Sequence, residues 1–202
     1  MRPITVEICA FGSYKGKQII DFRMATQNIF LISGNTGSGK STIFDSIVYA
    51  LYGEVSSSAK DKSGLMLVSQ FADKNVSPYV ELTFENNGET YVVRREPRHH
   101  TYNKSGKQNA TDANEKVTLR MPDGNDYPSK EANKKILEIV GLTKEQFMQI
   151  AMIAQGEFVD VLVAKSDKKR ETFRKLFGTE IYAKMIEESK NRVTSKNSEI
   201  KS

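Results

Sequence analysis

Residues 34–41 read Gly-Asn-Thr-Gly-Ser-Gly-Lys-Ser and fit the pattern G-x-x-x-x-G-K-[S/T] in full. A short apolar run, residues 28–32 (NIFLI), precedes this loop and favours a buried central strand. Apolar residues then recur at helical spacing, which predicts a helix over residues 40–52. A glycine-rich loop between a strand and a helix is the setting in which this pattern binds phosphate. The stretch therefore indicates an α/β fold with a nucleotide site.

The chemistry of this loop predicts ATP and Mg²⁺ as ligands. Its glycines allow a tight turn that points backbone N–H groups inward, and the start of the helix adds positive potential. Lys40 is expected to reach the β- and γ-phosphates, Ser41 to bind Mg²⁺ and Thr42 to reach the α-phosphate. The remaining nucleotide-binding residues expected in the loop are Asn35, Thr36, Gly37, Ser38 and Gly39.

Hydrolysis also needs an acidic residue at the end of a neighbouring strand, to hold Mg²⁺ and orient the attacking water. Glu81 and Glu85 alternate with apolar residues, which favours the solvent face of a hairpin. Asp160 falls in a segment that reads as helix. We therefore expect no catalytic residue in this chain, and no turnover by it alone.

Outside the loop, alternation predicts strands and helical periodicity predicts helices. Strands are expected over residues 4–8, 17–22, 79–85, 89–95 and 116–121, with a hairpin turn at 86–88. Helices are expected over residues 129–140, 143–154, 165–177 and 180–202. Residues 97–114 are polar and contain Pro and Gly, which predicts a long mobile loop.

The charge of the chain is unevenly distributed. The chain has 202 residues and a net charge of +5, and residues 165–202 alone hold 11 basic and 6 acidic side chains. Two interpretations stay open for this basic tail, a solvated helical face or a contact to the phosphate backbone of a nucleic acid.

Compartment and metal content follow from a few residues. The chain has one cysteine, Cys9, which excludes an intrachain disulfide framework and is expected to be a small buried residue. The adjacent His99 and His100 point to opposite sides of an extended segment, so a metal site built on them is not expected. No apolar run approaches 18 residues, and the N-terminus lacks the pattern of a signal peptide. These features favour the cytoplasm and no membrane partner.

The last segment has the spacing of a partial coiled coil. Ile186, Val193 and Ile200 are seven residues apart, and the positions between them are Tyr182, Ser189 and Lys196. The helical pattern reaches the last residue without a glycine cap or a proline. We therefore expect the start of a longer helix and a chain that is part of a larger protein.

Several stretches resemble one protein family. With Gly37 as an extra glycine, the phosphate loop has the form found in ABC-type ATPases, and residues 43–54 look like the SMC-like branch of these enzymes. Residues 153–158 (IAQGEF) resemble the Q-loop of that branch. Residues 164–171 and 174–182 (RKLFGTEIY) closely resemble the SbcC family, the ATPase subunits of bacterial SbcCD nucleases.

This resemblance implies the N-terminal half of a split ABC-type ATPase head. The expected fold is a mixed sheet around the P-loop helix, an antiparallel β lobe and a helical lobe that leads into a coiled coil. Residues 1–164 would be the ATPase lobe and residues 165–202 the helical segment. The implied partners are a C-terminal half with the missing acidic pair, a second head, the SbcD nuclease subunit and duplex DNA. ATP would control a double-strand exonuclease and hairpin endonuclease in DNA repair and recombination.

The resemblance also assigns further site residues. Gln155 looks like the Q-loop glutamine, a Mg²⁺ ligand, and Ser13 matches a position near the nucleotide. Two basic clusters are candidate DNA contacts, with solubility charge as the alternative for each. The first, on or beside the loop 97–114, consists of Arg94, Arg95, Arg98, Lys104 and Lys107; the second consists of Lys165, Lys168, Lys169 and Arg170.

Two other functions remain open at this point. The first is another coiled-coil ABC ATPase of DNA maintenance, SMC- or RecN-like, which would share the split head and lack the nuclease partner. The second is a P-loop small-molecule kinase, which would turn over ATP with these residues alone.

Overall fold

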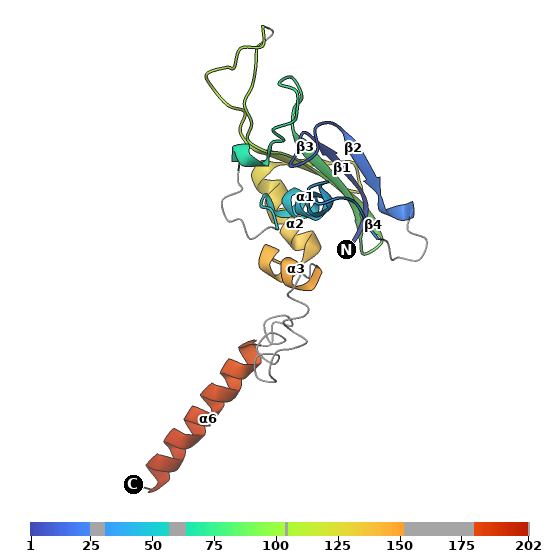
Figure 1. Cartoon of the computed structure of the whole chain (residues 1–202). Coiled ribbons are helices and arrows are strands. Elements are labelled where there is room, and N and C mark those ends of the chain that lie inside the picture. Colours follow the sequence, from blue (N-terminus) through green and yellow to red (C-terminus); the bar gives the residue numbers. More distant parts are fainter. Residues whose placement is uncertain (25–30, 57–63, 104, 152–179, 202) are drawn as a thin grey trace. The chain divides into compact units, whose positions relative to one another are not determined.

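The structure is a computed structural model, and it describes residues 1–24, 31–56, 64–103, 105–151 and 180–201 (Figure 1). The chain divides into two compact units, Met1–Leu142 and Thr143–Ser202. The expected boundary between residues 164 and 165 and the expected helix over 165–177 lie outside the described residues.

The first unit is built on one six-stranded sheet with the order β2-β1-β3-β4-β5-β6. Every neighbouring pair in it is antiparallel. The strands are β1 (Arg2–Cys9), β2 (Gln18–Asp21), β3 (Tyr79–Asn86), β4 (Glu89–Glu96), β5 (Lys116–Arg120) and β6 (Asp126–Pro128). The five predicted strands of this set are confirmed, whereas β6 is too short for its alternation to be read from the sequence.

One face of the sheet is apolar and packs against two helices, α1 (Lys40–Tyr52) and α2 (Ser129–Val140) (Figure 1). Strand alternation directs one set of side chains to this face, and its fully buried members are Val6, Ile8, Val80, Leu82, Phe84, Val93 and Leu119. Burying each stabilises the fold by roughly 1.5–3 kcal/mol. Glu81 and Glu85 lie on the opposite, polar face, as predicted.

The predicted helices over 40–52 and 129–140 are confirmed as α1 and α2. Two short 3₁₀ turns, η1 (Phe22–Met24) and η2 (Gly64–Leu67), complete the first unit. In the second unit, α3 (Lys144–Ala151) and α6 (Glu180–Lys201) correspond to the predicted helices over 143–154 and 180–202. The α/β class is confirmed.

The segment before the phosphate loop differs from the prediction. Leu31 and Ile32, the described end of the expected strand over 28–32, are in no strand, and Leu31 is 90% exposed. A strand forms only where a neighbour accepts its backbone hydrogen bonds, and none of the six described strands pairs with these residues. The parallel component of the expected mixed sheet is therefore not seen in the part of the chain that is described.

Between β4 and β5, the described residues 97–103 and 105–114 form a projecting β-like arm (Figure 1). Backbone hydrogen bonds join its two sides: His99 pairs with Ala113 in both directions, and Asn109 N–H donates to the carbonyl of Thr101. At the tip, Oδ1 of Asn103 accepts hydrogen bonds from the backbone N–H groups of Ser105 and Lys107. The segment predicted as a mobile loop thus has cross-strand pairing along its length.

Candidate functional site

The phosphate loop, residues 34–41, runs directly into helix α1. Gly39 is the residue before the helix and has φ +92°, a left-handed conformation that favours glycine. No side chain caps the helix N-terminus, and residues 34–38 are exposed. The first N–H groups of α1 are therefore uncapped donors beside an open loop, at the positive end of the helix dipole.

The side chain of Lys40 folds over this loop. Its ammonium donates hydrogen bonds to the carbonyl of Gly34 at 2.8 Å and to the carbonyl of Asn35 at 2.9 Å. The positive charge thus lies within the turn that the loop makes. Ser41 is exposed and Thr42 half-buried at the next two positions of α1.

A second loop, residues 10–14, packs against the phosphate loop. A Cβ at Gly39 would lie 3.2 Å from the Cβ of Ser13 and the ring of Tyr14, and the Tyr14 hydroxyl donates to the Gly39 carbonyl at 3.2 Å. At Gly12, with φ +56°, a Cβ would come within 2.6 Å of the Thr42 methyl group. The structure therefore brings Ser13 to the phosphate loop, although the two are over twenty residues apart in sequence.

Loop 10–14 is held in place from its other side. The Gly12 N–H donates to the carbonyl of Leu67, and the Ser69 N–H donates to the carbonyl of Ala10, each at 2.9 Å. Ala10 itself has φ +49°, a left-handed conformation that costs a non-glycine residue about 1 kcal/mol or more. The surrounding contacts therefore fix this loop in a strained conformation beside the phosphate loop.

A cavity of about 260 Å³ opens beside Thr42. Loop 10–14, helix α1 and the segment 66–71 line it, with Asp45, Gln70 and Phe71 among its side chains. Asp45 accepts hydrogen bonds from the backbone N–H and the hydroxyl of Ser56. Thr42, the residue expected to meet the α-phosphate, is one of the residues that line this cavity.

The C-terminal end of α1 packs against Arg95, a residue that the sequence analysis placed among the candidate DNA contacts. Arg95, on β4, is 2% exposed and faces the helix side of the sheet. Its Nε donates to the carbonyl of Ala50 at 3.1 Å and its Nη2 to that of Leu51 at 3.4 Å. Its Nη1 donates to Glu115 at 2.7 Å and its Nη2 to the side chain of Asn133 at 2.8 Å. We call these five residues the Arg95 cluster.

The prediction that Arg94 and Arg95 contact DNA is wrong for Arg95, because its side chain is buried and its guanidinium is bonded to groups within the protein. Arg94 lies on the outer face of the sheet, over the ring of Tyr79 and paired with Glu81 and Glu96. Alternation along β4 places Tyr91, Val93 and Arg95 on one face, so the inward position of Arg95 was readable from the sequence, whereas its acceptors were not.

The other candidate DNA residues are divided by the structure. Arg98, at the base of the arm, is half-exposed and pairs with Asp112, which also accepts a hydrogen bond from His100 at 2.7 Å. These two contacts hold the pKa of Asp112 below its ordinary value, with the His100 bond as the larger cause. Lys107 is exposed at the arm tip. Lys104, Gln155, Lys165, Lys168, Lys169 and Arg170 lie outside the described residues.

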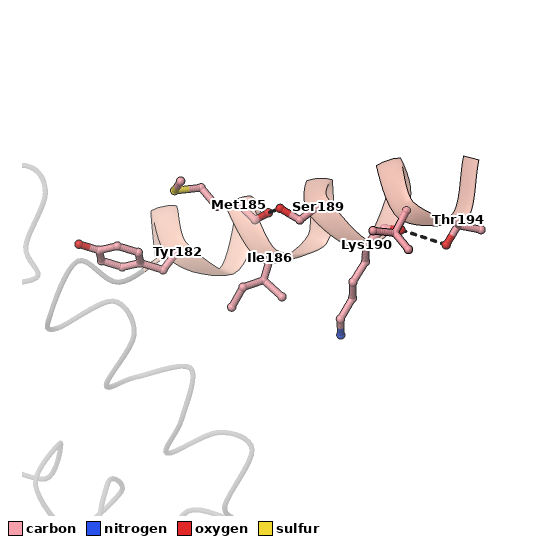
Figure 2. Close-up of a pocket in the computed structure, with 7 residues that line it drawn as sticks. Tyr182, Met185, Ile186, Ser189, Lys190 and Thr194 are labelled. Atoms are coloured by element: carbon pink, nitrogen blue, oxygen red, sulfur yellow. Dashed lines mark hydrogen bonds between the residues drawn. The ribbon is translucent and has the colours of Figure 1, made fainter. Parts of the chain in front are cut away.

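Helix α6 presents an apolar stripe to solvent (Figure 2). Tyr182, Met185, Ile186 and Val193 are each 58–64% exposed and line a shallow groove together with Ser189, Lys190 and Thr194. The predicted seam positions Tyr182, Ile186, Ser189 and Val193 therefore all line this groove.

The described residues hold neither a metal-binding cluster nor a membrane-spanning helix. No three His, Cys, Asp or Glu side chains among them lie close enough together to hold a metal ion. No helix in the described ranges is both long and apolar enough to cross a membrane. Cys9 is buried on β1, as predicted, and burial raises the pKa of its thiol.

The profile of a known protein family, described as AAA domain, matches residues 5–202. The match includes the phosphate loop, helix α1 and both units described above. The chain belongs to this AAA domain family. The family comprises P-loop ATPase domains, in agreement with the geometry at the start of α1.

Relatives within this family carry one recurrent name. The chain is 34% identical over 191 residues to the C subunit of the nuclease SbcCD from Vibrio cholerae, a match that covers 92% of this chain and 19% of that protein. It is 34% identical over 206 residues to the protein of the same name from Staphylococcus aureus (strain MRSA252), covering 99% of this chain and 20% of that protein. The resemblance to the SbcC family is thus confirmed, and the chain spans about a fifth of the length of these relatives.

Among solved structures, the SMC head domain from Thermotoga maritima is similar with a TM-score of 0.36 and 23% identity. The similarity covers 67% of this chain and 42% of that one.

Proposed function

We propose that this chain is the MgATP-binding N-terminal part of an SbcC-type ATPase. One observation carries the proposal: helix α1 begins, without a side-chain cap, directly after an exposed glycine loop into which Lys40 is folded. Uncapped N–H groups, a helix dipole and a lysine are the groups that bind a triphosphate. The family membership supports this interpretation.

In this proposal, each residue of the loop has a distinct role. Lys40 would exchange its two carbonyl partners for the β- and γ-phosphates, and the hydroxyl of Ser41 would hold Mg²⁺. Thr42 meets the α-phosphate, with Ser13 beside it, and the adjacent cavity takes the ribose and base. Gln155 adds a ligand to Mg²⁺. The backbone N–H groups of residues 35–39 surround the phosphates.

The second step of the proposal is that the site needs a partner to hydrolyse ATP. Glu81 lies on the outer face of the sheet in an ion pair with Arg94, away from α1. We infer that a C-terminal part of the same protein supplies the acidic pair, and that two such heads enclose two nucleotides. The chain alone would then bind MgATP without turning it over.

The third step concerns the wider assembly. The relatives are named as subunits of a nuclease, which favours a role in controlling a DNA exonuclease and endonuclease, SbcCD, in repair and recombination in the cytoplasm. Arg98 and Lys107 on the arm, with Lys104 and the basic cluster at 165–170, would contact duplex phosphates. The apolar stripe on α6 would pair in a coiled coil.

A binding and turnover experiment tests the proposal. Binding of a fluorescent ATP analogue is measured with and without Mg²⁺ for the unaltered chain, Lys40→Met and Lys107→Met. We expect Lys40→Met to lose at least about 100-fold in affinity, about 2.7 kcal/mol, and the arm variant Lys107→Met to bind as the unaltered chain does. Equal binding by Lys40→Met would contradict the proposed site.

Turnover is then measured for the chain alone and with the C-terminal part added. We expect Lys40-dependent hydrolysis only in the mixture. Fast hydrolysis by the chain alone would instead favour the small-molecule kinase. Failure of the mixed, active protein to bind a metal-dependent nuclease partner would favour an SMC- or RecN-like protein.

A further inference from the structure

Helix α1 is a rigid element of 13 residues that connects the phosphate loop to a buried ionic cluster. At about 1.5 Å per residue, the two ends are roughly 20 Å apart. The N-terminal residue of α1 is Lys40, and the carbonyls of Ala50 and Leu51 in its last turn accept from Arg95. What fixes one end of such a helix also limits where the other end lies.

The last turn of α1 contains no basic residue of its own. Terminal carbonyls carry partial negative charge and need donors when they are buried. Gly53 caps the helix through its N–H, which donates to the carbonyl of Tyr49 at 2.8 Å, and the guanidinium of Arg95 supplies donors to the carbonyls of Ala50 and Leu51. Hydrogen bonds from a charged donor are stronger than those between neutral groups.

The same guanidinium also connects α1 to the base of the arm. Arg95 lies two residues before the arm and Glu115 follows it directly, so their 2.7 Å ion pair closes the arm where it leaves the sheet. Asn133 connects α2 to the same group. A Cβ at Gly53 would lie 3.0 Å from both Arg95 and Glu115, so the backbone after α1 packs closely against the pair. One side chain thus joins α1, α2, β4 and the arm.

We propose that Arg95 is a positioning residue for the nucleotide site, which fixes the C-terminal end of α1 against the sheet and thereby sets the phosphate loop at the other end. The inference rests on the proposed MgATP site. Phosphate recognition depends on donors held within a fraction of an ångström, and misplacement by about 1 Å can cost 100-fold in function. A lysine at position 95 keeps the charge and loses the planar donor set that reaches several acceptors.

The strand that carries Arg95 provides a matched control. Arg94 is the next residue, also forms two ion pairs, and points to the opposite face of the sheet, away from α1. Arg94→Lys and Glu81→Ala therefore disturb an ion pair on β3 and β4 without touching α1. Arg95→Lys and Glu115→Ala disturb the Arg95 cluster, and Glu115 is 45% exposed, so its replacement is expected to leave the chain folded.

Two measurements on the 202-residue chain test the inference, both well below the unfolding temperature of each variant. The first is MgATP affinity, which is a property of folded molecules and is not altered by a loss of stability alone. We expect the dissociation constant to rise at least about tenfold in Arg95→Lys and about threefold in Glu115→Ala, and to stay within about twofold in the two controls. If Arg95→Lys does not fold, Glu115→Ala decides the outcome.

The second measurement is amide hydrogen exchange without nucleotide. We expect faster exchange at residues 44–46, whose N–H groups bond to the carbonyls of residues 40–42 in the first turn of α1, in Arg95→Lys and Glu115→Ala only. Faster exchange confined to residues 47–53, with unchanged affinity, would overturn the inference. If the unaltered chain binds no MgATP, the proposed function fails by that result, and the exchange at residues 44–46 still decides whether Arg95 controls the phosphate-loop end of α1.

Discussion

Helix α1 begins after an exposed glycine-rich loop and ends against the buried guanidinium of Arg95. The backbone N–H groups at its N-terminal end need acceptors, and the carbonyls at its C-terminal end need donors. At the N-terminal end, no side chain caps the helix, and the loop before it, residues 34–38, is exposed. At the C-terminal end, Arg95 fills the acceptors of Ala50 and Leu51 with the protein's own cation. The N-terminal end therefore offers donors to an external anion, whereas the carbonyls of Ala50 and Leu51 at the C-terminal end are paired within the protein.

The largest expected effect comes from removing the positive charge of Arg95. Arg95→Met leaves the carbonyls of Ala50 and Leu51 and the half-exposed Glu115 without their donor, and each buried acceptor left unpaired costs about 1–3 kcal/mol. Urea unfolding measures the loss. Arg94→Met, in the half-exposed pair on the other face, is expected to cost about 1 kcal/mol or less. Equal losses would mean that Arg95 stabilises the fold no more than a half-exposed ion pair on the outer face does.

The next largest expected effect comes from adding MgATP. At a concentration of MgATP about 100 times its dissociation constant, binding stabilises the folded chain by about 2.7 kcal/mol. Thermal unfolding with and without MgATP measures this gain, and EDTA should reduce it. Lys40→Met is expected to unfold as the unaltered chain does without nucleotide and to gain nothing from MgATP. A large loss of stability in Lys40→Met alone would assign Lys40 a structural role at the open end.

Two glycines with similar backbone angles test how closely the C-terminal end is packed. Gly53 has φ +75°, and a Cβ there would lie 3.0 Å from Arg95 and Glu115, whereas Gly88 has φ +83° with nothing within 4 Å. Alanine costs about 1–2 kcal/mol at either position for the left-handed backbone. We expect Gly53→Ala to cost about 1 kcal/mol more than Gly88→Ala in urea unfolding, because its methyl group also displaces the ion pair. Equal losses of stability would show that Arg95 and Glu115 shift to accommodate the methyl group at little cost.

The smallest effect comes from the outer face of the sheet, away from both ends. Burial raises the pKa of Glu7, but hydrogen bonds from Tyr79 and Lys17 outweigh it and leave the pKa below its ordinary value. The contribution of Glu7 is therefore present above an unfolded pKa of about 4.3 and is lost as pH falls through the lower folded value.

Urea unfolding between about pH 6 and pH 3 measures this effect. Glu7→Gln is expected to lose less stability over this range than the unaltered chain, by less than about 1 kcal/mol. Glu85→Gln, whose partner Arg2 is 66% exposed, serves as the control and is expected to change the pH profile less.

The same comparison explains what the sequence predicts well. The open end of α1 depends on backbone geometry, so a short contiguous motif of glycines and Lys40 predicts it, and periodicity places α1 itself at residues 40–52. Strand alternation predicts β3 and β4 for the same local reason.

The C-terminal end of α1 depends on residues from four separate segments, and no local sequence pattern connects them. Arg95 looked like a surface cation beside a polar loop because neither Glu115 nor Asn133 is near it in sequence. The pairing within the arm was hidden in the same way, since its two sides lie about ten residues apart around a polar turn. Leu31 was expected in a strand because an apolar run carries no information about whether a neighbouring strand exists.

The order of the strands has a consequence for how the chain folds. From β3 to β6 each strand pairs with the next one along the chain, and β1 pairs with β2 through a short turn. Among the six described strands, only the pairing of β1 with β3 joins distant segments, and the phosphate loop and α1 lie between these two strands in the sequence. Short-range pairing of this kind favours rapid folding, because little loop entropy is lost before contacts form. On a ribosome, the step that waits is therefore the closure of β1 on β3, which encloses α1 and creates the phosphate loop in the same event.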